Sequence, residues 1–246
     1  VLHQIFQADI VRLQEVLYMT TNLRELTIGR VDGGFTGNQF SQLMDCLQFL
    51  TKVQSLTLGA TCTTTSANFR SLCLRAQALQ SLSLDLSGNR LLFDQVTPLT
   101  LLSQSAHLQT VQLNLQHNNW GRKAVQLFGS WQDMPALRSL RVDLTSCGID
   151  SGGTAPLASL AQSKSLVDLH LNLTLNSIDG ADIQHLAQLP SCPSLRELSL
   201  RLSGNMGINC QGVAPLGDGA LQRMTSLTFE FGNTGIRRKG MKALIT

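Results

Sequence analysis

Hydrophobic and polar residues alternate in five short segments of the chain, each eleven residues long. The segments read LQSLSLDLSGN, LQTVQLNLQHN, LRSLRVDLTSC, LVDLHLNLTLN and LRELSLRLSGN, and they begin at Leu79, Leu108, Leu137, Leu166 and Leu195. Each segment starts 29 residues after the one before it. Alternation with a period of two is typical of a β-strand that buries one face. The pattern therefore predicts five strands at one regular spacing.

Weaker copies of the same pattern flank these five. LRELTIG starts at Leu23, VQSLTLG at Val53 and MTSLTFEFGN at Met224, which gives about eight repeats of about 29 residues. Residues 1–22 place apolar side chains at helical spacing and are expected to form the helix of a still earlier unit: Ile5, Phe6, Ile10, Leu13, Val16 and Leu17. The closing GMKALIT resembles the start of another helix. We interpret residues 1–246 as a single repeat domain and as a fragment of a longer solenoid.

Each unit continues into a turn and then a helix. The turn position holds Asn89, Asn118, Cys147, Asn176 and Asn205 in successive units. An asparagine side chain there can bond the backbone groups of the turn, and we expect the cysteine to be structural in the same way. The segment GADIQHLAQL illustrates the amphipathic helix expected behind each strand. Because no unit can bury both of its faces alone, stacking of neighbouring units must supply the core.

These repeats resemble the leucine-rich-repeat family, and their length with helical backs is similar to its ribonuclease-inhibitor-like class. The amino-acid sequences of the repeats are also similar to repeat arrays of large protist proteins. The resemblance implies an α/β horseshoe solenoid with a parallel sheet on the concave side, helices on the convex side and a role as a binding scaffold. The repeat departs from the family pattern by two residues, which add an inward leucine to each strand: Leu86, Leu115, Leu144, Leu173 and Leu202.

The outward residues of stacked strands are expected to form three polar columns on the concave face. The first column is Ser81, Thr110, Ser139, Asp168, Glu197 and Ser226; the second is Ser83, Gln112, Arg141, His170, Ser199 and Thr228; the third is Asp85, Asn114, Asp143, Asn172, Arg201 and Glu230. One interpretation is a solvated face whose charges avoid self-repulsion. The other is a partner-binding patch where charge is densest, made of Arg141, Asp143, Asp168, His170, Asn172, Glu197, Arg201 and Glu230.

Catalysis is not expected on this face. Asp168, His170 and Ser199 could be imagined as a triad, but a triad also needs an oxyanion hole and exclusion of water, and two residues along a strand is a poor geometry for orienting a histidine. The six cysteines form no C-x-x-C pair and are followed by no histidine at metal-ligand spacing. The sequence therefore predicts no enzyme, no cofactor and no metal.

Composition narrows the class of partner. A net charge of +3 with one basic cluster, Arg237, Arg238, Lys239 and Lys242, gives no basic stripe for nucleic acid, and we interpret the cluster as a solvated helix start. No apolar run is long enough to span a membrane. Packed repeats rarely enclose a small-molecule site. Protein is the partner that remains, and free thiols without a secretion signal favour an intracellular, cytoplasmic location.

The leading hypothesis is a non-catalytic protein–protein interaction scaffold, a subunit of a larger assembly that binds through its concave face. Two alternatives are a regulator, inhibitor or activator, of an enzyme or GTPase, and the ligand-recognition module of a receptor. A further alternative is the accessory portion of a longer enzyme.

Overall fold

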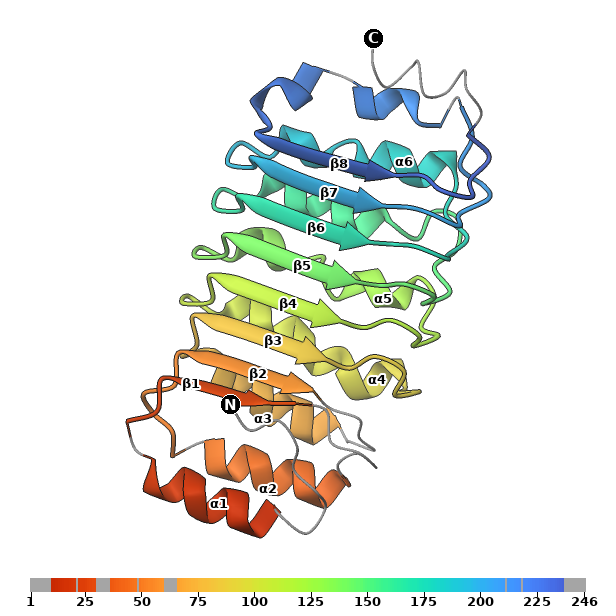
Figure 1. Cartoon of the computed structure of the whole chain (residues 1–246). Coiled ribbons are helices and arrows are strands. Elements are labelled where there is room, and N and C mark those ends of the chain that lie inside the picture. The colour runs from red at the N-terminus through yellow and green to blue at the C-terminus, as the bar shows by residue number, and fades with distance from the viewer. Residues whose placement is uncertain are drawn as a thin grey trace.

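Eight parallel strands form one sheet in which each strand pairs with the next along the chain (Figure 1). The computed structural model describes residues 10–20, 22–29, 36–47, 49–59, 66–210, 212–217 and 219–236. The strands are β1 (Glu25–Ile28), β2 (Ser55–Gly59), β3 (Ser81–Asp85), β4 (Thr110–Asn114), β5 (Ser139–Asp143), β6 (Asp168–Asn172), β7 (Glu197–Arg201) and β8 (Ser226–Glu230).

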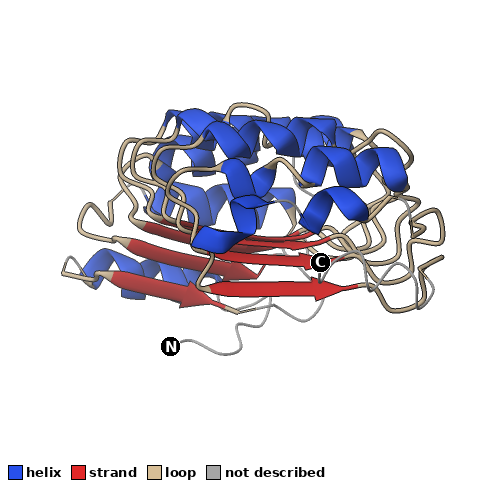
Figure 2. Cartoon of the chain, turned by 90° about the horizontal axis from the view of Figure 1, so that it is seen from above, coloured by secondary structure: helices blue, strands red, loops and turns tan. Residues whose placement is uncertain are grey.

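Helical segments cover one face of this sheet (Figure 2). The α-helices are α1 (Ile10–Met19), α2 (Gly37–Leu47), α3 (Ser66–Ala76), α4 (Phe93–Val96), α5 (Lys123–Gln126) and α6 (Gly180–Leu186). The 3₁₀ helices are η2 (Thr97–Gln104), η3 (Trp131–Asp133), η4 (Ala155–Gln162), η5 (Leu189–Ser191), η6 (Ala214–Gly217) and η7 (Gly219–Arg223). We call the other face, on which the strand residues of the three columns lie, the open face. The predicted α/β leucine-rich-repeat solenoid is confirmed.

The backs of the central repeats differ from the expected amphipathic α-helices. Both η2 and η4 are 3₁₀ helices of eight residues, and α4 and α5 are only four residues long. In η2, Pro98 lies in the first turn. The buried side chains Leu99 and Leu102, like Leu157 and Leu160 in η4, are three residues apart. That spacing matches the three-residue turn of a 3₁₀ helix.

The extra inward leucine of each repeat lies fully in the core. Leu86, Leu115, Leu144, Leu173 and Leu202 are at most 1 % exposed. Each also extends the backbone ladder beyond the formal strand, as where the Leu86 amide donates to the Asn114 carbonyl at 2.8 Å. The two tryptophans, Trp120 and Trp131, are also buried.

Buried asparagines tie the turns of successive units together. The Asn176 amide nitrogen donates to the carbonyls of Leu144 at 3.0 Å and Leu173 at 2.9 Å. Its Oδ1 accepts from the amides of Cys147 at 3.1 Å and Ile149 at 3.0 Å. In the cysteine-bearing unit, burial raises the pKa of the Cys147 thiol to about 12, so the thiol stays neutral and is structural, as predicted.

The N-terminal helix fits its prediction in part. Leu13 and Leu17 of α1 are buried, but Val16 is 50 % exposed and does not belong to the packed face. Ile5 and Phe6 lie outside the described residues, as do the 237–242 basic cluster and the GMKALIT segment. Within the described part of the chain, no helix is long and apolar enough to cross a membrane.

Substitution of Leu171 by Asp tests the stacking of the core. Leu171 is 1 % exposed, so a carboxylate there has no solvent, and we expect a loss of roughly 4 kcal/mol or more with unfolding of neighbouring units. Circular dichroism during thermal melting measures this. Gln112→Asp places the same charge on the open face and should keep native helix content. An unchanged melt for Leu171→Asp would contradict the stacking.

Substitution of Asn176 by Ala tests the asparagine ladder. It leaves two buried amides and the Leu144 carbonyl without their partner, whereas the Leu173 carbonyl still accepts from Asn205, so the free energy of unfolding should fall by about 2–4 kcal/mol. Urea denaturation gives this value. The exposed Asn119 serves as control, with a change within about 0.5 kcal/mol for Asn119→Ala. Equal stability of the two variants would show that the ladder does not hold the turns.

Candidate functional site

The register of the sheet brings the eight predicted patch residues onto four neighbouring strands, β5 to β8. Asp168 is paired with Glu197, His170 with both Arg141 and Ser199, and Arg201 with Glu230. In the third column Asp143 is paired with Asn172. The three predicted columns are therefore confirmed as sets of adjacent side chains, although neighbours within one column are about 29 positions apart in the sequence.

Two ion pairs cross between strands on this face. The Arg141 guanidinium donates to Asp168 Oδ2 at 3.1 Å, and the Ser139 hydroxyl donates to the same oxygen at 2.8 Å. Arg201 Nε lies 3.2 Å from Glu230 Oε1. Both arginine side chains remain about half exposed, at 49 % and 53 %. Exposed pairs of this kind contribute little to stability, so these side chains are available to an incoming partner.

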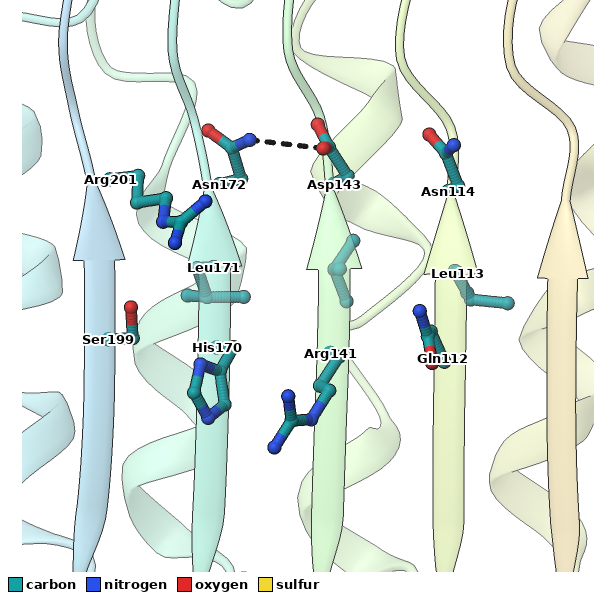
Figure 3. Close-up of a pocket in the computed structure, with 11 residues that line it drawn as sticks. Gln112, Leu113, Asn114, Arg141, Asp143, His170, Leu171, Asn172, Ser199 and Arg201 are labelled. Carbon is teal, nitrogen blue, oxygen red and sulfur yellow. Dashed lines mark hydrogen bonds between the residues drawn. The ribbon is translucent and has the colours of Figure 1, made fainter. Parts of the chain in front are cut away.

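A shallow hollow of about 260 Å³ lies between the two arginines (Figure 3). The Arg141 guanidinium extends toward β6, and the Arg201 guanidinium reaches toward Asn172 (Figure 3). Asp143 completes the upper rim, where its Oδ2 accepts from the Asn172 amide at 3.0 Å. The other outward residues that line the hollow are Gln112, Asn114, His170 and Ser199.

The hollow contains five of the eight predicted residues. Asp168, Glu197 and Glu230 do not line it, whereas Gln112, Asn114 and Ser199 do and were left out of the predicted patch. The three missed residues belong to the predicted columns, but the patch was chosen by charge. Column position, not charge, was the signal that could have found them.

Asp168 and His170 lie close together on β6, but they do not form the hydrogen bond that would orient the imidazole. His170 Nε2 lies 2.6 Å from Asp168 Oδ1, and neither atom makes a hydrogen bond of acceptable geometry, in line with the poor geometry expected from their spacing. Successive outward side chains of a strand share one face, and both of these lean along β6. The Ser199 hydroxyl is turned away from the imidazole (Figure 3). The arrangement therefore lacks the nucleophile–base contact that a triad requires.

The open face is more acidic than the chain as a whole. From β3 to β8 the three columns hold five carboxylates, Asp85, Asp143, Asp168, Glu197 and Glu230, against the two guanidinium groups. The full chain has a formal net charge of +3. A surface of this kind repels a phosphate backbone and suits a partner that offers cations, amides and a few carboxylates.

The solved structures compared with this chain are distant likenesses. No protein-family model matches the chain, and the search of curated proteins found no match. Internalin C2 of Listeria monocytogenes superposes with a TM-score of 0.39 at 19 % identity. The superposition covers 94 % of this chain and 70 % of the internalin chain. TLR13, solved as a complex with ssRNA13, superposes with a TM-score of 0.40 at 17 % identity. The superposition covers 89 % of this chain and 34 % of the TLR13 chain. The assignment to the leucine-rich-repeat fold stands on the repeat and the sheet.

Substitution of Glu197 by Gln tests the electrostatics of the face. Glu197 stands directly opposite Asp168, and like charges at paired positions are destabilising. In chelator-treated buffer the variant should gain up to about 1 kcal/mol in free energy of unfolding, measured by urea denaturation. Glu25→Gln is the matched control, because Glu25 is in the same column but opposite Ser55. A clear loss of stability in Glu197→Gln would mean that the glutamate makes an attractive contact.

Proposed function

We propose that this protein is a non-catalytic scaffold that binds a partner protein through the open face, around the hollow between Arg141 and Arg201. The observation that carries the proposal is that hollow: two half-exposed guanidinium groups, an imidazole and side-chain amides converge on one place in an otherwise uniform polar sheet. Arginine is enriched at the centres of protein interfaces because it forms several directed hydrogen bonds at once.

A protein partner fits this face better than the other classes. The excess of carboxylates disfavours nucleic acid. The hollow is open and polar, whereas small-molecule sites enclose most of their ligand. Protein interfaces, by contrast, combine a flat outline with mixed charges and hydrogen-bonding groups at the rim.

The proposal places the chain as a subunit of a larger assembly inside the cell. Among the described residues, the buried thiols of Cys73, Cys147 and Cys192 form no disulfide, which supports a reducing compartment. A regulator of an enzyme or GTPase and a receptor module remain the alternatives, and both would use the same face. Identification of the partner separates the three functions.

The test is an affinity capture from the native source with quantitative mass spectrometry of the proteins that co-purify. The wild-type chain should retain a recurring partner in stoichiometric amount. The double variant Arg141→Ala with Arg201→Ala should lose at least about tenfold of it, since central arginines contribute about 1.4 kcal/mol or more to binding. Circular dichroism should show both proteins folded.

The matched control is the double variant Arg70→Ala with Lys164→Ala, which removes two exposed cations elsewhere on the molecule. It should retain the partner. Retention by the open-face variant would place the contact on another surface. Recovery of the chain alone, or as part of a longer polypeptide with a catalytic domain, would overturn the scaffold proposal.

A further inference from the structure

Two carboxylates and an imidazole meet on the open face beside the hollow, which His170 also lines. Ligand atoms of Asp168, His170 and Glu197 all lie within 4.8 Å of one another. Asp168 and Glu197 occupy directly paired positions of β6 and β7, where two negative charges repel each other. Repeat stacking alone does not explain why these charges are adjacent, because the other outward carboxylates of β3 to β8 have no carboxylate at the paired position.

Two atoms of this cluster are buried and lack a hydrogen-bond partner. Asp168 Oδ1 and His170 Nε2 are both shielded from solvent and neither makes a hydrogen bond of acceptable geometry, although they lie only 2.6 Å apart. Buried polar atoms without a partner are rare and call for an explanation. The two atoms face each other and not their neighbours, so one metal ion could bind to both of them.

Two hydrogen bonds hold the other carboxylate oxygen of Asp168 in place. Asp168 Oδ2 accepts from the Ser139 hydroxyl and from Arg141, which orients Oδ1 toward His170. Metal-binding carboxylates are commonly held in this way by hydrogen bonds to the oxygen that does not bind the ion. Arg141 offsets one negative charge, and with a neutral imidazole the cluster keeps a net charge of about −1 from its two carboxylates.

We propose that Asp168 Oδ1, His170 Nε2 and the Glu197 carboxylate bind one divalent transition-metal ion, of which Zn²⁺ is the best fit. One imidazole with two carboxylates supplies the nitrogen and oxygen ligands that zinc accepts, whereas Ca²⁺ and Mg²⁺ need six or more oxygen ligands. Three protein ligands leave a fourth tetrahedral position open.

The ligands need only a small adjustment to hold the ion. Zinc bonds of about 2.0–2.1 Å in tetrahedral geometry separate two ligand atoms by roughly 3.3 Å. The imidazole must therefore move by less than about 1 Å from its present position. Its side chain is 35 % exposed, and Glu197 is exposed, so both have room to move. The site goes beyond the proposed scaffold function and does not depend on it.

The test measures metal binding directly on the purified, chelator-treated chain. Isothermal titration with Zn²⁺ gives the stoichiometry, and titration with Co²⁺ reports the ligands through its visible absorption. The wild-type chain should bind one ion per chain at this site, without the sulfur-to-cobalt band that a cysteine ligand produces. His170→Ala should abolish this binding, and Glu197→Gln should weaken it by at least about tenfold.

Two matched variants control for other residues of the same kind. His107→Ala removes an exposed histidine elsewhere, and Glu25→Gln removes the glutamate of the same column that has Ser55 opposite; both should bind like the wild type. The proposal is overturned by no binding up to about millimolar metal, by binding that survives His170→Ala, or by a cobalt spectrum dominated by thiolate. In each of those cases the contact between Asp168 and His170 is an ion pair and nothing more.

Discussion

The backbone ladder between successive units is the constraint on which this structure depends. The amide after each of the strands β3 to β7 donates to the next unit, as from Leu115 to Asp143 and from Leu144 to Asn172, both at 2.8 Å. The inward leucine at that position is completely buried beneath the ladder. A shift of one residue would turn that leucine toward solvent, so hydrogen bonding and burial select the same register.

A fixed register turns sequence distance into spatial contact. His170 and Glu197 are far apart in the chain, yet they approach each other because their strands are adjacent and parallel. The same holds for Arg201 and Glu230, which meet at 3.2 Å. The chemical character of the open face is thus determined by the residues that each repeat places at three strand positions. A binding site can be built there by substitutions that leave the leucine lattice unchanged.

The sequence predicted the sheet better than the layer behind it. Strand order, register and the buried Asn176 and Cys147 follow from a repeat in which position determines environment. The 3₁₀ helices behind the central strands were not predicted, because the period of an α-helix was assumed there. The three-residue spacing of Leu99 and Leu102 was nevertheless visible in the sequence. The patch was found in part, since column positions are periodic. Side-chain direction along a strand is not periodic, which is why the approach of Asp168 to His170 could not be foreseen.

The register of the stack can be measured directly with paired cysteines. Thr110 and Ser139 are paired across β4 and β5, and parallel neighbours about 4.8 Å apart are within the Cα range of a disulfide. Mild oxidation of the Thr110→Cys, Ser139→Cys variant should form that bond within one chain, as mapped by mass spectrometry. The offset variant Gln112→Cys, Ser139→Cys, with roughly 8 Å between Cα atoms, should not. A disulfide in the offset variant and none in the paired one would contradict the register and the site built on it.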